Sequence, residues 1–146
     1  MIIKTKYLGY VEAEENSIIN FPRGIYGFEN TIRYVLLRDR RSDNPFMWMQ
    51  HTDSSEPCFV VADPQQLNLD YSPVITPTMA GLIGLKSPNA LRIIVIATVP
   101  KNYRELSLNL KCPVIINSRE NIAAQVILEQ EEEYPLRYYL FDKERG

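Results

Sequence analysis

Short runs of strand-forming residues, separated by prolines, glycines and polar turns, recur along most of this chain. Apolar and polar residues alternate in some of these runs, which is typical of a strand with one face in water. The run at 91–99 is instead almost continuously apolar, which predicts a central strand buried on both faces. The other predicted strands span 2–7, 10–14, 17–21, 33–37, 46–50, 58–62, 67–71, 106–110, 114–117 and 124–128.

Helical signals are few in comparison. Thr76 or Thr78 can cap a short helix that runs to Leu85, although Gly81 and Gly84 each weaken it by up to about 1 kcal/mol. Strands therefore dominate, about 10 residues apart, and an open sheet of so many strands would leave long unpaired edges. We predict an all-β, mainly antiparallel fold: a small closed or nearly closed β-barrel of about eight to ten short strands with one or two short helices.

The chain shows no internal division. Residues 1–146 contain no repeat, low-complexity tract or linker, which predicts a single domain. The runs 2–7 and 10–14 predict one hairpin, and 124–128 predicts another with the strand before it. From about residue 135 the tail is again apolar and aromatic, so it adds an edge strand or lies over the barrel, and its last residues fray.

The segment 18–29 begins as a strand and ends as a loop. Pro22 stops the strand, and Gly24 and Gly27 indicate turns with positive φ or a close approach of two backbone segments. The loop therefore carries large apolar side chains outside regular structure. They either fold back as a plug over one end of the core or face outward as an anchor for a protein partner. These side chains belong to Phe21, Ile25, Tyr26 and Phe28.

The composition is that of an ordinary globular protein. The 146 residues are 45% hydrophobic and 23% charged, with a formal net charge of −2. That charge argues against a broad nucleic-acid-binding surface, because such surfaces are basic. No apolar run approaches the roughly 20 residues that cross a bilayer, and the first residues lack the apolar stretch of a signal peptide. We therefore expect a cytoplasmic protein without membrane contact, with Cys58 and Cys112 as buried, reduced thiols.

Candidate catalytic and metal-binding groups are scarce. His51 is the only histidine, and its polar surroundings predict an exposed loop residue. A single histidine excludes multi-histidine metal sites, and Gly24 and Gly27 lack the spacing of a phosphate-binding loop. We expect no enzymatic activity, no cofactor and no metal. One alternative is a small-ligand-binding or catalytic barrel. A deep pocket lined by Tyr, Met and Trp with a strongly perturbed titratable group would favour it, and a filled core would exclude it.

A second alternative is a nucleic-acid-binding barrel. Proteins that bind single strands place aromatic side chains over a basic groove. Tyr7, Tyr10, Tyr34 and Trp48 fall on predicted strands, but the clustered arginines are confined to one loop, at 38–41. We therefore expect no direct contact with nucleic acid.

Two features favour a protein-binding module instead. The apolar loop can supply a desolvated anchor, and a run of glutamates either steers a basic partner or forms a solvated turn. Asn117, which follows a strand, either caps a turn or faces a partner. The glutamates of the acidic run are Glu129, Glu131, Glu132 and Glu133.

The segment 21–29, with the sequence FPRGIYGFE, resembles the signature segment of the FliW family, the bacterial flagellar assembly factors. Three further blocks resemble the family in the same order along the chain. They are 45–50, 58–64 and 109–117, the last of which leads into 125–128. The resemblance therefore covers nearly the whole chain.

The resemblance implies a small β-barrel that acts as a non-enzymatic regulatory binding protein. FliW proteins bind in turn the translational repressor CsrA, a small basic dimer, and flagellin; they antagonise CsrA, and free flagellin restores repression. The resemblance thus implies a cytoplasmic, chaperone-like factor of flagellum biogenesis, and we expect a monomer when it is free. We assign CsrA to the acidic run and flagellin to apolar residues near the loop. The expected contact residues are Phe21, Ile25, Tyr26, Phe28, Asn117, Glu129, Glu131, Glu132 and Glu133.

Overall fold

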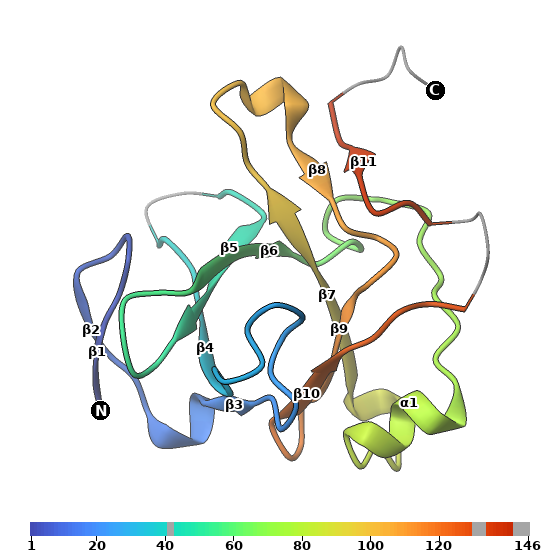
Figure 1. Cartoon of the computed structure of the whole chain (residues 1–146), viewed down its shortest axis with the longest axis horizontal. Helices are drawn as coiled ribbons and strands as arrows, with labels where there is room; N and C mark the ends of the chain where they lie inside the picture. Colours follow the sequence, from blue (N-terminus) through green and yellow to red (C-terminus); the bar gives the residue numbers. More distant parts are fainter. Residues whose placement is uncertain (41–42, 130–133, 142–146) are drawn as a thin grey trace.

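The computed structural model describes residues 1–40, 43–129 and 134–141. Its main sheet closes on itself because β7 (Leu91–Thr98) pairs on one side with β6 (Cys58–Ala62) and on the other with β9 (Val114–Asn117). The pairings give a closed ring of seven strands. Figure 1 looks into this ring. The ring continues through β5 (Phe46–His51), β4 (Arg33–Leu37), β3 (Ile19–Asn20) and β10 (Ile122–Gln125). The predicted closed barrel is therefore confirmed.

Most neighbouring strands run antiparallel, as predicted. The exception among the described pairs is β3 with β10, which are parallel and meet through Asn20 and Ile122. The hairpin of β9 and β10 is confirmed, but β10 begins two residues earlier than the predicted run and ends at Gln125. Beyond Gln125 the backbone still donates hydrogen bonds to the segment before β9, from Val126 N to Pro113 O at 3.0 Å and from Leu128 N to Lys111 O at 2.9 Å. Ile127, between these two residues, is 51% exposed.

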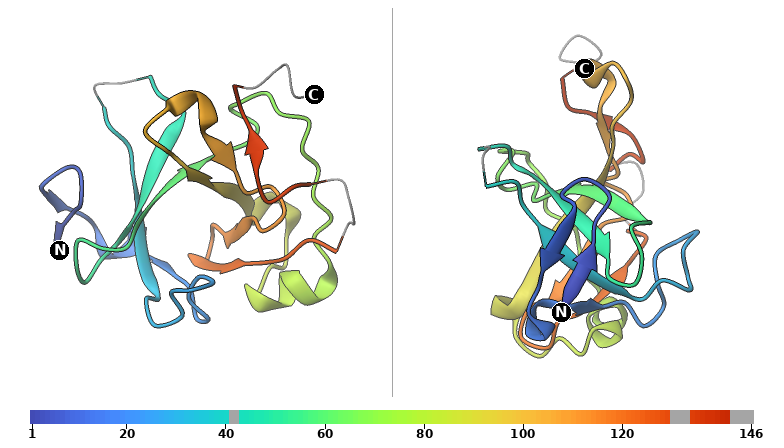
Figure 2. Two further views of the ribbon diagram at one scale, coloured as in Figure 1. Left: turned by 45° about the horizontal axis from the view of Figure 1, so that its top comes forward. Right: turned by 90° about the vertical axis from the view of Figure 1, so that its left-hand side faces the viewer.

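Two small units extend the barrel. Towards its end, β7 still pairs with β6 on one side up to Ala97, but on its other side β8 (Ser107–Leu108) replaces β9, and β8 in turn pairs with β11 (Tyr138–Tyr139). We call these three strands the arm; in Figures 1 and 2 it rises at the opposite end of the molecule from α1. The tail thus adds an edge strand, and its residues 142–146 lie outside the described part. The predicted first hairpin forms from β1 (Ile2–Lys4) and β2 (Tyr10–Glu12).

The one α-helix in the described part, α1 (Pro77–Leu82), has the predicted cap. The side chain of Thr76 accepts a hydrogen bond from Met79 N at 3.2 Å. The helix ends before the predicted Leu85 because Gly84 adopts a left-handed conformation with φ of 61°. Three short 3-10 turns accompany the helix, at Glu15–Ser17, Pro88–Ala90 and Tyr103–Glu105. No helix in the described residues is long and apolar enough to cross a bilayer.

The predicted strand at 67–71 is wrong. This segment instead forms successive turns, in which Leu67 N and Leu69 N both donate to Pro64 O. Asn68 has a φ of 55°, a left-handed conformation that a strand does not contain. The alternating apolar side chains still have a function, because they pack against the arm without any ladder of hydrogen bonds. They belong to Leu67, Leu69 and Tyr71.

The interior of the barrel is filled with apolar side chains. Ile94 of β7 points into this interior, whereas its neighbour Val95 packs in a second cluster under the arm, and both are fully buried. The prediction that the run at 91–99 is buried on both faces is therefore confirmed at its centre, whereas its first residues are half-buried and Val99 is 50% exposed. The interior cluster consists of Ile19, Phe21, Ile25, Tyr34, Met47, Met49, Val61, Ile94, Val114, Ile116 and Ala123.

Candidate functional site

The loop that follows β3 is held in a narrow, folded-back shape. Phe21 N donates to Ile32 O at 2.7 Å, and Phe28 N donates to Ile25 O at 2.6 Å, so that the tip lies at Tyr26 and Gly27. Gly24 has a φ of 67°, and a Cβ at this position would lie 2.5 Å from the Cα of Glu29. The shape therefore depends on a residue without a side chain at Gly24.

The two interpretations of the apolar loop apply to different residues. Phe21 and Ile25 are 0% and 2% exposed and belong to the interior cluster. There the ring of Phe21 packs edge-on against the ring of Tyr34, with the two ring centroids 5.1 Å apart. They form the plug, and Figure 1 shows their loop in front of the ring of strands. Tyr26 and Phe28 are 55% and 43% exposed. The structure thus places the first pair in the core and only the second pair at the surface.

A cleft of about 370 Å³ lies where the loop faces α1 and the chain that leaves β10. We call it the loop cleft. Tyr26 N donates to the Oε1 atom of Gln125 at 3.1 Å, which ties the tip of the loop to the end of β10. The cleft is lined by Arg23, Gly24, Tyr26, Glu29, Met79, Leu82, Ala124, Gln125, Val126 and Ile127.

The acidic run begins beside the loop cleft. Ile127 lines the cleft, and Glu129, two residues later, is exposed. Glu29, which belongs to the loop, is exposed and lines the same cleft. Two carboxylates therefore accompany the apolar rim in the described structure. The other acidic-run candidates, Glu131, Glu132 and Glu133, lie outside the described residues.

Asn117 is a structural cap. Its side chain is 3% exposed, and its Nδ2 atom donates to Ile83 O at 2.9 Å and to Gly84 O at 3.2 Å. Its Oδ1 atom accepts from Arg119 N at 3.1 Å and from Glu120 N at 3.4 Å. Of the two alternatives for Asn117, the turn cap is the one that the structure shows, and it also joins the end of α1 to the barrel.

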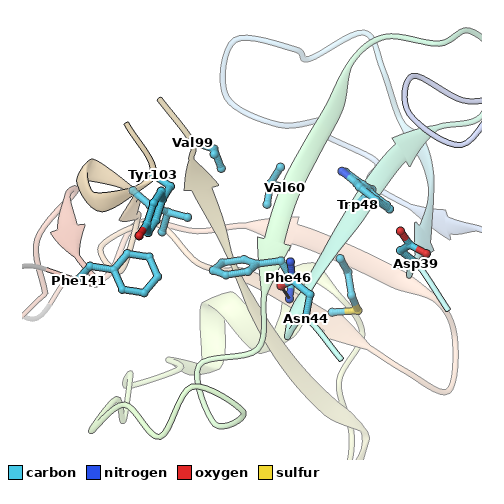
Figure 3. A pocket seen from close by; sticks show the side chains of 10 residues that line it. Asp39, Asn44, Phe46, Trp48, Val60, Val99, Tyr103 and Phe141 are labelled. Carbon is cyan, nitrogen blue, oxygen red and sulfur yellow. Dashed lines mark hydrogen bonds between the residues drawn. The ribbon is translucent and has the colours of Figure 1, made fainter. Parts of the chain in front are cut away.

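A second cavity, of about 460 Å³, lies between the outer face of the barrel and the arm. Figure 3 shows Tyr103 and Phe141 together on one side of it, Trp48 and Asp39 on the other, and Phe46 between them. We call it the aromatic groove. Its Tyr, Met and Trp lining matches what a ligand-binding barrel would need, but the groove is outside the barrel, whose interior is filled.

The sequence comparisons agree with this architecture. The sequence model of the family described as "FliW protein" matches residues 2–140. The chain belongs to the FliW family. A "Flagellar assembly factor FliW" of Ruminiclostridium cellulolyticum is 37% identical over 143 residues, which cover 98% of this chain and 96% of the relative. The protein of that name from Thermoanaerobacter pseudethanolicus is 35% identical over 132 residues, which cover 90% of this chain and 88% of the relative.

A solved structure supports the family assignment. The crystal structure of the flagellar assembly factor FliW superposes on this chain with a TM-score of 0.88 and covers 99% of each chain, at 27% identity. The closed barrel with its arm and hairpin is thus a fold that this FliW-family chain shares with that protein. The predicted family resemblance is confirmed over nearly the full length.

His51 differs from its predicted state in this FliW-family chain. It is 8% exposed, not an open loop residue, because β5 extends to His51 and pairs it with Tyr34. Its Nδ1 atom lies 3.2 Å from Glu56 O, and its Nε2 atom lies 3.7 Å from the Asp53 carboxylate. Within the described residues, no group of three or more His, Cys, Asp or Glu side chains is arranged to hold a metal ion.

Replacing Asn117 with aspartate should make stability fall as pH rises. The new carboxylate would face two carbonyl oxygens, which disfavours its charged form and raises its folded pKa above the unfolded value near 3.9. The variant should therefore be most stable below about pH 4 and lose stability up to the folded pKa, by about 2 kcal/mol at pH 7. Urea unfolding from pH 3 to 8 measures this.

A matched control is Asn109→Asp. The Oδ1 atom of Asn109 accepts from Cys112 N at 2.9 Å, a hydrogen bond that a carboxylate also accepts. We expect no loss of stability with rising pH in this variant. A flat pH dependence in Asn117→Asp would contradict the hydrogen-bond assignment of Asn117.

Cys112 is buried as predicted, whereas Cys58 is only half-buried. Both thiols should nevertheless react slowly. Burial raises the pKa of Cys58 from 9.0 to about 11, and burial also raises the pKa of Cys112. In a Cys112→Ser variant at pH 8, Cys58 should react with iodoacetamide about 100-fold more slowly than an unperturbed thiol, because that much less thiolate is present. The rate should rise tenfold per pH unit up to about pH 11 and become ordinary in urea. An ordinary rate in the native protein would contradict the burial of this thiol.

Proposed function

We propose that this chain is a non-enzymatic regulatory binding protein that binds and antagonises the translational repressor CsrA and that also binds flagellin. Binding flagellin releases CsrA, so the level of free flagellin controls its own translation and couples it to flagellum assembly. The observation that carries the proposal is the family match over residues 2–140. Relatives that match 90% or more of the chain carry the name flagellar assembly factor.

Surface features of the described residues support binding to proteins. Tyr26 and Phe28 present aromatic side chains at the surface of a loop that hydrogen bonds hold in shape. A rigid aromatic anchor is the usual centre of a protein interface. The carboxylate of Glu129 and the rest of the acidic run in the sequence offer attraction to a basic partner such as CsrA.

The proposed role also determines the setting. CsrA acts on messenger RNA, so the protein works in the cytoplasm as a free monomer until it meets a partner, and it needs no direct contact with nucleic acid. We assign no catalytic residue. His51, the chain's only histidine, is buried at the end of β5.

A displacement experiment tests this function. The protein is mixed with CsrA at micromolar concentration, flagellin is then added, and binding of CsrA to a flagellin-leader RNA is followed by fluorescence anisotropy. We expect the RNA to lose CsrA when this protein is added and to regain it when flagellin follows. If the protein bound neither CsrA nor flagellin, the proposal would be refuted. Binding of both without displacement would refute the proposed control of translation.

A further inference from the structure

The loop cleft brings together two features that the sequence separates by about 100 residues. Tyr26, at the tip of the loop, and Ile127, beyond β10, line the same cleft and are 55% and 51% exposed. Leu82 of α1 is half-buried and lines the same cleft. The apolar residues assigned to flagellin and the start of the acidic run assigned to CsrA are therefore parts of one surface.

The walls of this cleft are fixed before any partner arrives. Gln125 accepts from Tyr26 N at 3.1 Å, and its Nε2 atom donates to Cys112 O at 3.3 Å. Gly27 N donates to the Glu29 carboxylate at 3.1 Å. The loop is thus tied to the end of β10 and braced by a hydrogen bond of its own, so a partner loses little free energy in ordering it.

The charges around the cleft indicate what kind of segment it accepts. Glu29 lines the cleft and Glu129 follows Ile127, whereas Arg23 is the only cation among the lining residues. An apolar cleft with one exposed carboxylate in its lining and a second one two residues beyond Ile127 is complementary to an apolar side chain with basic neighbours. An acidic or uncharged segment gains less from these carboxylates.

We propose that the loop cleft is the docking site for an apolar side chain on a basic segment of CsrA, with Glu29 and Glu129 pairing with the basic side chains that flank it. This inference rests on the proposed function. Flagellin covers the same exposed Tyr26 and Ile127, so the two partners exclude each other by direct overlap. No change of conformation has to pass between separate sites.

The first test removes the apolar rim. Tyr26→Ser and Ile127→Ser alter exposed side chains, so circular dichroism and thermal unfolding should stay unchanged. By isothermal titration calorimetry, each change should raise Kd by about thirtyfold for CsrA and also for flagellin. The matched control is Tyr103→Ser with Phe141→Ser, which removes a comparable exposed aromatic pair from the aromatic groove. The control should leave both affinities unchanged.

The second test removes charge and keeps the fold. Glu29→Gln retains an oxygen that accepts from Gly27 N, and Glu129→Gln changes an exposed residue. In stopped flow, the double variant should bind CsrA about threefold more slowly at low salt, with a weaker dependence on salt. The matched control is Glu12→Gln with Glu14→Gln near the first hairpin, which are also exposed and should retain the native rate.

The outcomes separate this inference from the proposed function. If the native protein binds neither CsrA nor flagellin, the proposed function fails. If both bind but the loop-cleft variants keep either affinity, the shared site is wrong while the function stands. Loss of flagellin binding in the aromatic-groove control would likewise overturn the inference, because it would place flagellin at a separate site.

Discussion

Replacing Gly24 with alanine should destabilise the protein by about 3 kcal/mol or more. The added Cβ would lie 2.5 Å from the Cα of Glu29 and 2.6 Å from the carbonyl oxygen of Phe28. Both are backbone atoms, so no side-chain rotation relieves the clash. The φ of 67° adds the strain of a left-handed conformation.

Gly27 provides the matched control. Its φ of 87° is also positive, but a Cβ there would meet nothing within 4 Å. Gly27→Ala should therefore show the conformational strain alone, about 1–2 kcal/mol. Urea unfolding of both variants separates the clash from the strain. Equal losses in the two variants would contradict the close backbone approach at Gly24.

The closed barrel was predictable because its strands have clear local patterns. The run 33–37 contains consecutive strand-forming residues and became β4 with the same bounds. Pro22 marked the end of β3, and Thr76 marked the start of α1, because proline and capping residues act locally. Closure followed from the number of strands and the cost of unpaired edges.

Features that depend on long-range packing were not predictable in the same way. The alternation at 67–71 suits a strand, yet these side chains reach the arm from a series of turns, since packing requires apolar surface and not a ladder. His51 lies in a polar stretch, and its burial follows from the pairing of β5 with β4. Local sequence contains neither fact.

The candidate site was predictable only in part. The sequence indicated that the loop 21–29 is special, but not which of its apolar side chains turn inward. Burial of Phe21 and exposure of Phe28 follow from the fold-back at Ile25 and from the barrel mouth beneath it. The loop cleft needed the hydrogen bond between Tyr26 and Gln125, which joins residues 99 positions apart. A single sequence holds no signal for that contact.

Phe21→Ala should be among the most destabilising substitutions in the loop, with a loss of about 3–5 kcal/mol. The side chain is fully buried and packs edge-on against Tyr34 at 5.1 Å, so its removal leaves a cavity inside a closed barrel. Strands on all sides limit how far the surroundings can collapse into that cavity. Urea unfolding of the variant measures the loss directly.

The same substitution at Phe28 distinguishes folding from binding. Phe28 is 43% exposed and meets Phe59 edge-on at 5.2 Å, so Phe28→Ala should cost only about 1 kcal/mol. If the exposed face of Phe28 contacts flagellin, Phe28→Ala loses affinity for flagellin while it stays folded. Phe21→Ala, measured under conditions in which it is still folded, keeps its affinity for flagellin. Equal stability losses at the two positions would show that Phe21 does not fill the barrel mouth. In that case the division of the signature segment into core residues such as Phe21 and contact residues such as Phe28 would have to be abandoned.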